Sequence, residues 1–232
     1  MPPHKLTRES VVSAAVDLAD REGIAALTMR RLARHVGVEA MSLYHHLPNK
    51  EALLDAMVDR VYAAIELPTP DGDWRSGLRT RSESVRAVLL QHPWALPLME
   101  SRQAPGPANL AYHEATIACL RAAGFGPAQV AHAYAVIDAF VYGFVLQETS
   151  LPFDSGEEAA TMVTDGPFGE LLATYPNMTW FTTNVILAPG YSYEREFRPG
   201  LELVLDGIAE RRADGIPGGA ARPPAGAATT DT

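Results

Sequence analysis

The stretch VGVEAMSLYHHLPNKEALLDA, from Val36 to Ala56, decides the fold expected for the N-terminal part of this chain. Gly37 follows one short amphipathic segment, and the pair Pro48-Asn49 separates a second from a third. Gly ends helices because it adopts the left-handed conformation without strain, whereas Pro interrupts a helix and Asn caps the start of the next. The pattern therefore predicts three consecutive helices joined by tight connections.

Three positions around the first connection fit a helix-turn-helix. Ala33 and Gly37 are four residues apart, and Leu43 follows six residues later. A small residue lets two helices approach, Gly permits the tight turn, and an apolar residue on the second helix holds the pair together. An ordinary corner between two helices can have the same spacing, so the spacing alone does not decide between them.

The helical period continues through the rest of the chain, and no segment of the head alternates with the period of a strand. We expect an all-α protein. The expected helices cover residues 6–22, 29–36, 39–47, 50–65, 74–91, 107–123, 127–149 and 194–213, with shorter ones between 150 and 193. Apolar residues recurring every three to four positions and Gly, Pro, Thr or Asn at the ends support these helices.

We expect two domains and a tail. A helix-turn-helix domain covers residues 1–50, with a connecting helix over 50–66, and a helical body covers 67–213. Residues 214–232, GIPGGAARPPAGAATTDT with the preceding Asp, contain almost no bulky apolar side chain. Such a composition cannot offset the entropy of ordering, so we expect a disordered tail.

Charge is distributed unevenly along the chain, whose formal net charge is −9. Residues 1–50 contain 7 Lys and Arg against 5 Asp and Glu, and the remaining residues contain 12 against 23. A slightly basic head on an acidic body favours a protein that contacts a polyanion with one end only.

Several features place the protein in the cytoplasm. The single cysteine, Cys119, cannot form an internal disulfide, and its Ala, Ile and Leu neighbours indicate a buried packing residue. No signal peptide precedes the first amphipathic pattern. The longest apolar runs, such as Ala139–Leu146, are too short to span a bilayer, so we expect no membrane partner.

The second helix of the motif has an unusual outer face. A solvated face would be rich in Glu and Lys, whereas small, hydroxyl, aromatic and imidazole side chains lie off the face of Leu43 and Leu47. These residues are Ala40, Met41, Ser42, Tyr44, His45 and His46. Such groups can enter a major groove, contact base edges and hydrogen-bond phosphates.

Cations begin the helices on either side of this segment. Arg30 and Arg31 lie in the first turn of the preceding helix, and Lys50 lies in the first turn of the following one. A cation at a helix N-terminus opposes the helix dipole, which is a poor choice for stability alone. A bound phosphate would be attracted by both the cation and the free amides of the helix start. The arrangement therefore indicates double-stranded DNA as a partner.

The segment LTMRRLARHVGVEAMSLYHHLPNKEALLDAM closely resembles the DNA-binding head of the tetracycline-repressor (TetR) family of transcription factors. The resemblance covers about residues 5–65. DWRSGLRTRSESVRAVLLQHP and HAYAVIDAFVYGFVLQE more loosely resemble the regulatory domain of the tetracycline-sensing subgroup. The resemblance implies a homodimeric repressor that binds a palindromic operator and is released by a small-molecule inducer.

The resemblance also assigns DNA-contacting positions. Thr28, Arg30, Ser42, Tyr44, His46 and Lys50 match positions of the family motif that contact DNA. Ala40 and Met41 stand at base-reading positions, and His45 stands where an aromatic residue is common. Because these three differ from the family pattern, the operator sequence does not follow from the resemblance.

The body departs from the tetracycline-sensing pattern. By the resemblance, Arg81 replaces a drug-contacting asparagine, Val85 an aromatic residue, and Met99 a magnesium-ligating histidine, while Gln147 stands near the metal's water shell. A hard cation prefers oxygen ligands, which Met99 does not supply. We therefore expect no metal, no cofactor and no magnesium–tetracycline sensing.

In place of a magnesium–tetracycline site, we expect an apolar, aromatic cavity for a mid-sized amphipathic ligand. Its candidate residues are Arg81, Val85, Trp94, Met99, His113, Ile117, Tyr134, Asp138 and Gln147. Aromatic residues at helical spacing are more often core than pocket, so this assignment and a plain core remain open. As a group, however, they carry more polar tips than a dry core prefers.

The homodimer is expected to form through two helices of each subunit. Residues 127–149 and 194–212 carry broad apolar faces and would make a four-helix interface. The candidate contact residues are Val136, Phe140, Phe144, Leu201, Val204, Leu205 and Ile208.

Other functions are less well supported. Adjacent His45 and His46 point about 100° apart on a helix and cannot readily chelate one ion, and the segment HEATI lacks the second histidine of HExxH. No phosphate loop or GxSxG motif indicates an enzyme. A constitutive architectural DNA-binding protein remains an alternative, although the helical body is larger than dimerisation alone requires.

Overall fold

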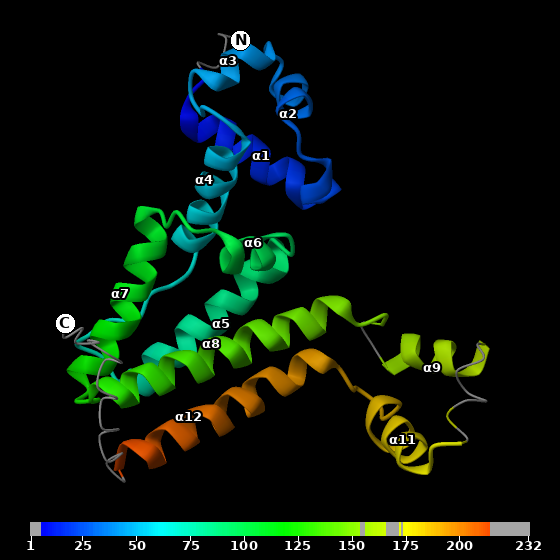
Figure 1. The fold of residues 1–232 in the computed structure, drawn as a ribbon. Coiled ribbons are helices and arrows are strands. Elements are labelled where there is room, and N and C mark those ends of the chain that lie inside the picture. Colours follow the sequence, from blue (N-terminus) through cyan, green and yellow to red (C-terminus); the bar gives the residue numbers. More distant parts are fainter. Residues whose placement is uncertain (1–5, 154–155, 166–171, 173, 214–232) are drawn as a thin grey trace, which may run out of the picture.

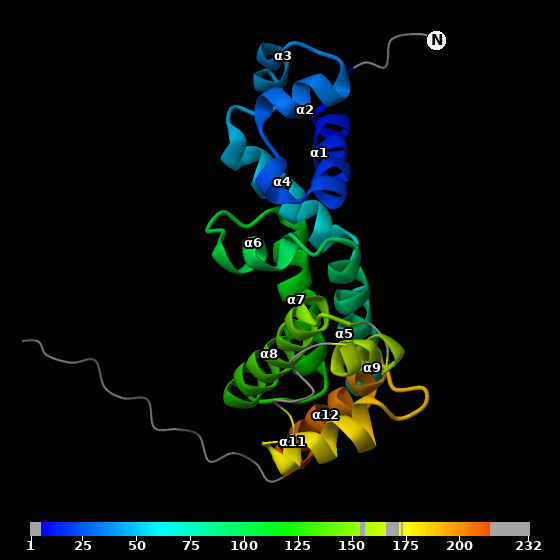
Figure 2. The same ribbon diagram turned by 90° about the vertical axis from the view of Figure 1, so that its right-hand side faces the viewer.

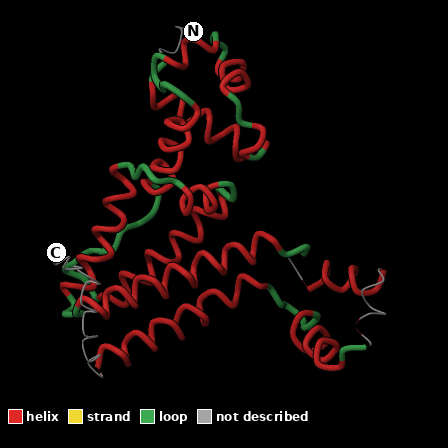
Figure 3. The backbone as a smooth tube through the Cα atoms, in the orientation of Figure 1, coloured by secondary structure: helices red, strands yellow, loops and turns green. Residues whose placement is uncertain are grey.

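A computed structural model describes residues 6–153, 156–165, 172 and 174–213 of the 232-residue chain. These residues form helices, turns and loops without any strand, as Figure 3 shows, so the expected all-α class is confirmed. The predicted tail, residues 214–232, lies outside the described residues.

The head and the connecting helix come first in the chain. Their elements are α1 (Arg8–Glu22), η1 (Ile24–Ala26), α2 (Met29–Val36), α3 (Ala40–Tyr44) and α4 (Lys50–Ala63). The body contains α5 (Trp74–Gln91), α6 (Ala95–Ser101), α7 (Pro107–Ala122) and α8 (Pro127–Ser150). It continues with α9 (Gly156–Asp165), α11 (Pro176–Phe181), η2 (Thr182–Ile186), η3 (Tyr193–Glu196) and α12 (Phe197–Ala213).

Side-chain caps fix where the helices begin. The side chains of Thr7, Thr28, Asn49 and Asp73 each accept a hydrogen bond from a backbone N–H of the first helical turn. A helix start leaves four N–H groups without intrahelical partners, and a capping oxygen satisfies one of them. Local chemistry of this kind is visible in a sequence, which explains why these starts match the expected ones.

Two elements differ from the expectation. The helix α3 is shorter than the predicted 39–47, because the chain tightens after Tyr44 and His46 N–H bonds to the Leu43 carbonyl at 3.0 Å. The helix α6 was not predicted. Pro97 lies in its first turn, where the missing N–H of proline needs no partner, so this proline is compatible with a helix.

The helix-turn-helix predicted from spacing is confirmed. Gly37 ends α2 in the left-handed conformation, with φ 73°. Ala33, Leu43 and Leu47 are buried between the helices of the head. The single methyl of Ala33 allows α2 and α3 to approach, and the two leucines seal the underside of α3.

The helix α4 joins the head to the body. It packs against α1 on one side and against α6 and α7 on the other. Figures 1 and 2 show the head at one end of the molecule, with α4 leading from it into the helices of the body. Any displacement of α4 by the body therefore acts directly on the head.

The end of the body opposite the head contains α8 and α12, two helices that are far apart in the sequence. The helices α8 and α12 pack side by side and run in opposite directions (Figure 1), while α5 and α7 cover the other side of α8. The helices α9 and α11 lie beyond the ends of this pair.

The sequence-based expectation about membrane segments needs correction. The run Ala139–Leu146 belongs to α8, and this helix is long and apolar enough to cross a membrane by length and composition alone. Contacts with α5, α7 and α12 cover part of its surface. Cys119, in contrast, is buried as predicted, and burial raises the pKa of its thiol.

Candidate DNA and ligand sites

The outer face of α3 is exposed and differs chemically from its buried face. The side chains of Met41 and Tyr44 are 71% and 43% exposed, and His45 is also exposed. Ala40, Ser42 and His46 are half-buried. All six side chains that were predicted to contact DNA from this segment therefore have accessible surface, and Leu43 holds the segment in place from beneath.

Two cations near α3 are free of ion pairs. Arg30 and Lys50 are exposed, and within the described residues neither has a carboxylate partner. Arg31, by contrast, forms an ion pair with Glu22 of α1. The unpaired cations begin α2 and α4, where free backbone amides also favour an anion. The geometry suits two phosphates flanking α3.

Thr28 has a structural role in addition to its predicted DNA contact. Its Oγ1 accepts a hydrogen bond of 3.1 Å from the N–H of Arg31 and caps α2. The hydroxyl hydrogen is not used by this bond, so Thr28 is able to cap the helix and donate to a phosphate at once.

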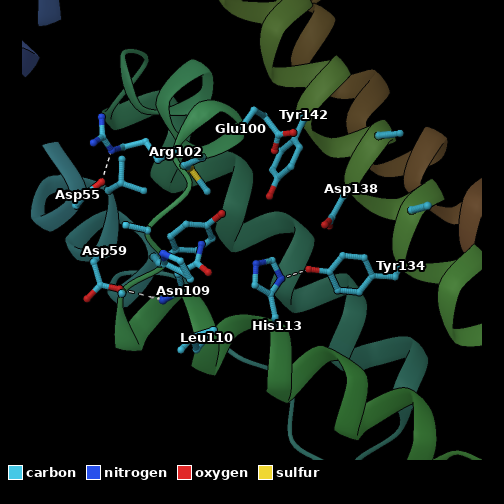
Figure 4. A pocket seen from close by; sticks show the side chains of 18 residues that line it. Asp55, Asp59, Glu100, Arg102, Asn109, Leu110, His113, Tyr134, Asp138 and Tyr142 are labelled. Atoms are coloured by element: carbon cyan, nitrogen blue, oxygen red, sulfur yellow. Dashed lines mark hydrogen bonds and ion pairs between the residues drawn. The ribbon is translucent and has the colours of Figure 1, made fainter. Parts of the chain in front are cut away.

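A cavity of about 650 Å³ lies in the body, between α4, α6, α7 and α8. Figure 4 shows its labelled residues, with Asp55 and Asp59 on one side and Tyr134, Asp138 and Tyr142 on the other. Ligand pockets commonly have volumes of roughly 300–1,000 Å³, so this one can hold a mid-sized molecule. It opens to the surface of the single chain.

A buried guanidinium supports the cavity from behind. Arg81 of α5 retains 1% of its exposed surface, and its Nη2 donates to Asp138 Oδ1 at 2.6 Å and to the hydroxyl of Tyr112. Its Nε is buried without a hydrogen-bond partner in the described residues. A buried charge is costly unless it is paired, so this contact fixes Asp138 and Tyr112 and ties α5 to α7 and α8.

The phenols and the imidazole of the cavity wall are held neutral. Burial raises the pKa of Tyr62 to about 12, and it also raises the pKa values of Tyr134 and Tyr142. Burial lowers the pKa of His113, whose Nδ1 is hydrogen-bonded to the Tyr134 hydroxyl. Around neutral pH the phenols therefore keep their protons and the imidazole carries no charge.

Four of the predicted ligand residues line this cavity, namely Met99, His113, Tyr134 and Asp138. Arg81 lies directly behind Asp138 rather than at the cavity surface. The structure brings these five predicted residues together from four helices, α5 to α8.

The remaining four candidate ligand residues do not line this cavity. Val85 is buried in the core. Ile117 lies on α7 one turn beyond His113, outside the part of the helix that lines the cavity. Trp94 donates to Asp20 of the head at 2.6 Å. Gln147 is exposed and accepts a hydrogen bond of 2.6 Å from Tyr193, about one and a half turns beyond Tyr142, the last residue of α8 that lines the cavity.

The sequence reasoning missed the wall contributed by α4, the end of α6, the segment that follows it and the start of α7. Its residues are Asp55, Val58, Asp59, Tyr62, Glu100, Arg102 and Asn109. One signal was available: Asp55, Asp59 and Tyr62 are spaced four and three residues apart, which places them on one face of α4. We predicted only a connecting role for this helix, but its mixed acidic and aromatic face indicates a second role.

Polar contacts bind α4 to the other parts of this wall. Arg102 forms ion pairs with Asp55 and with Glu51 of α4. Asp59 Oδ1 accepts hydrogen bonds from the backbone N–H groups of Ala108 and Asn109, at 2.8 and 3.0 Å, and so caps the start of α7.

The predicted dimer surface is only partly available. Leu201 and Leu205 have no exposed surface and Phe144 and Ile208 are also buried, because they fill the contact between α8 and α12 within one chain. These four assignments are corrected accordingly. Val136 is 49% exposed, and Phe140 and Val204 are half-buried, so these three remain candidates.

Comparisons with known proteins agree over nearly the whole chain. Residues 11–57 match the model described as bacterial regulatory proteins, tetR family, and residues 67–212 match the tetracyclin repressor-like C-terminal domain. A repressor named DrrR1 from Streptomyces coeruleorubidus is 33% identical over 93% of this chain and 83% of its own length.

Two further similarities extend this result. A transcriptional regulator from Saccharopolyspora erythraea is 42% identical over 145 residues, which are 62% of this chain and 61% of that protein. The structure of ActR from Streptomyces coelicolor in complex with actinorhodin superimposes with a TM-score of 0.71 at 28% identity, covering 91% of this chain and 99% of ActR.

Proposed function

This chain belongs to the TetR family of bacterial regulatory proteins, and on that premise we propose that it is a ligand-responsive repressor that binds a palindromic operator as a homodimer. A small amphipathic molecule held in the cavity of the body would release it from DNA. The match of ActR, whose structure contains actinorhodin, supports a small-molecule ligand for a protein of this fold.

One observation carries the proposal: α4 belongs to both sites. Its first residue, Lys50, is the unpaired cation beside α3, and Asp55, Val58, Asp59 and Tyr62 line the cavity. At about 1.5 Å of rise per residue, only roughly 8 Å of helix separates Lys50 from Asp55. A ligand that moves this face of α4 therefore moves the helix start that faces the phosphate.

The DNA contacts follow from the accessible residues. We assign the major-groove surface to Ala40, Met41, Ser42, Tyr44, His45 and His46. Arg30 and Lys50 would bind phosphates, and the hydroxyl of Thr28 would donate a hydrogen bond to a phosphate from the N-terminus of α2. Phosphate contacts position the protein and base contacts specify the sequence, so operator choice would depend on α3.

The dimer would form through the outer surfaces of α8 and α12. Leu203 is 74% exposed there, and Val136 and Leu146 are exposed as well. Gly143 and Gly207 have open space where a Cβ would lie. Helical glycines without a covering side chain let a second helix approach closely, which explains their presence despite a cost of about 1 kcal/mol each in helix propensity.

The arm formed by α9 and α11 would add to this interface. It carries an exposed apolar set, namely Met162, Tyr175, Met178, Trp180 and Phe181. Because soluble monomers rarely expose so many large apolar side chains on one segment, we assign the arm to contact with the second subunit. The second subunit would then cover the apolar outer face of α8, which agrees with a cytoplasmic protein.

We divide the chain accordingly into a DNA-binding domain over residues 1–50 with its connecting helix 50–66, and a regulatory and dimerisation domain over 67–213. The match of two separate family models on either side of residues 58–66 supports this division. The helix α4 then serves as the mechanical link.

Footprinting of the purified protein on the DNA upstream of its own coding region tests the function. We expect protection of a palindrome whose half-sites lie roughly 34–36 Å apart or more, on one face of the duplex. Protection that does not depend on sequence would favour the architectural alternative. Subsequent addition of candidate aromatic metabolites tests release.

A further inference from the structure

The lining of the cavity has an excess of negative charge. Four carboxylates line it, from Asp55, Asp59, Glu100 and Asp138, whereas Arg102 is the one Lys or Arg side chain among its described lining residues. Figure 4 shows Glu100 and Asp138 on the same side of the cavity as Tyr142. A wall of one sign raises the local concentration of ligands of the opposite sign.

The nearby guanidinium groups are already engaged. Arg102 is paired with Asp55 and Glu51 of α4. Arg81 lies behind the wall and is paired with Asp138. An anionic ligand entering the cavity would have to break one of these pairs and face the remaining carboxylates, which costs free energy twice.

Glu100, in contrast, has no ion-pair or hydrogen-bond partner in the described part of the chain. It lies close enough to Tyr62 for its charge to help raise the pKa of that phenol, so its field reaches the cavity. Asp59 has only the amides at the start of α7 as partners. These two carboxylates supply negative charge that the protein itself does not compensate with a side-chain cation.

Aromatic rings complete the lining. Tyr62, Tyr134 and Tyr142 present neutral phenols, and His113 is a neutral imidazole around pH 7. The negative face of an aromatic ring attracts a cation, and its area packs against flat apolar molecules. Rings and carboxylates together are the combination that recognises organic ammonium groups.

A metal ion explains the carboxylates less well. Among the described residues no three His, Cys, Asp or Glu side chains are grouped so that they could hold one ion. The carboxylates are spread along the cavity instead, from α4 to α8. Such a spread suits a molecule of extended shape rather than a single ion.

We propose that the ligand of this cavity is an organic cation, with a flat aromatic body against the tyrosines and a protonated amine between Glu100 and Asp138 beside Tyr142. This inference rests on the proposed function, because it assigns the chemical class of the molecule that releases the repressor.

Three acridines of similar shape and different charge test it on the full chain without DNA. At neutral pH 9-aminoacridine is a cation, acridone is neutral and acridine-9-carboxylate is an anion. Fluorescence titration should give the tightest binding for the cation, by about tenfold or more over acridone, and the weakest for the anion. Added salt should weaken binding of the cation only.

Two variants locate the charge. Glu100→Gln should weaken the binding of 9-aminoacridine by about tenfold and leave the binding of acridone unchanged, since the amide has the same shape without the charge. The matched control is Glu114→Gln, an exposed carboxylate on α7 that does not line the cavity, which should change neither.

Binding that favours the anion, or that is equal for all three probes and insensitive to Glu100→Gln, would overturn the assignment of a cation. Failure of every probe to bind would overturn it as well. The operator footprint needs no ligand, so a sequence-specific footprint would preserve the DNA-binding function in either case.

Discussion

The indole Nε1 of Trp94 donates a hydrogen bond of 2.6 Å to Oδ1 of Asp20. Nδ1 of His92 lies 2.7 Å from the same oxygen. These contacts join the start of α6 to α1 of the head, while the other end of α6 supplies Met99 and Glu100 to the cavity. The head is therefore connected to the cavity through α6 as well as through α4.

Trp94→Phe should destabilise the protein by about 1.5–3 kcal/mol, because Phe keeps an aromatic ring but removes the indole donor to the Asp20 carboxylate, which then keeps only its contact with His92. Chemical denaturation measures the change. A double-mutant cycle with Asp20→Asn should give a coupling free energy of about 1 kcal/mol or more. The control is Tyr44→Phe, which changes an exposed aromatic residue of α3 and should leave the stability of the DNA-free protein unchanged; equal effects of the two variants would contradict the contact.

Lys50→Ala should weaken operator binding and lower the salt dependence by about one phosphate contact, since the lysine has no carboxylate partner in the described residues and begins α4 next to α3. Binding isotherms at several salt concentrations measure both quantities. Arg60→Ala removes an exposed cation from the same helix about 15 Å further along, and should change neither. An unchanged affinity and slope for Lys50→Ala would show that this residue does not bind phosphate.

Leu203→Glu should convert the dimer to a monomer at micromolar concentration, because it places a charge in the centre of the exposed α8–α12 surface. Sedimentation velocity gives the oligomeric state. Leu110→Glu alters another exposed leucine away from this surface, and that variant should remain dimeric. A dimeric Leu203→Glu protein would place the interface elsewhere.

Glu202→Gln should lower stability at neutral pH by about 0.5–1 kcal/mol. Hydrogen bonds from Arg79 and Arg75 lower the pKa of Glu202 from 4.5 to about 2. A carboxylate with a lowered pKa stabilises the fold above its unfolded pKa, and this contribution is lost as the pH falls from about 4.5 towards 2.

The difference between wild type and Glu202→Gln should therefore shrink over that pH window, which thermal unfolding at a series of pH values can follow. The control is Glu210→Gln. It changes an exposed carboxylate on the same helix, α12, that has no ion pair among the described residues. A constant difference at every pH would mean that Glu202 acts through packing rather than charge.

Magnesium–tetracycline should not bind saturably at micromolar concentration, although the family includes its sensors. The thioether of Met99 lines the cavity at the position that corresponds to a magnesium ligand by resemblance, and it offers no oxygen. Tetracycline fluorescence with and without magnesium measures the interaction. Saturable micromolar binding that requires the metal would refute this prediction.

Much of the head followed from local sequence. Thr28, Gly37 and Asn49 act through hydrogen bonds and backbone conformation within a few residues, so their effect is visible in the sequence itself. The period of apolar residues likewise determined which face of α3 is buried, through Leu43, and which face is left exposed.

The ligand site depended on the crossing of helices that are distant in sequence. Met99, His113 and Asp138 meet because α6, α7 and α8 pack together, and nothing in the spacing of α4 alone reveals that Asp55 faces them. For the same reason the sequence did not reveal that Trp94 contacts the head, or that Leu201 and Leu205 pack against α8 of the same chain. The sequence by itself determined where helices start, stop and turn, because those are short-range effects; tertiary structure alone decided which faces meet, because packing selects among many faces of similar hydrophobicity.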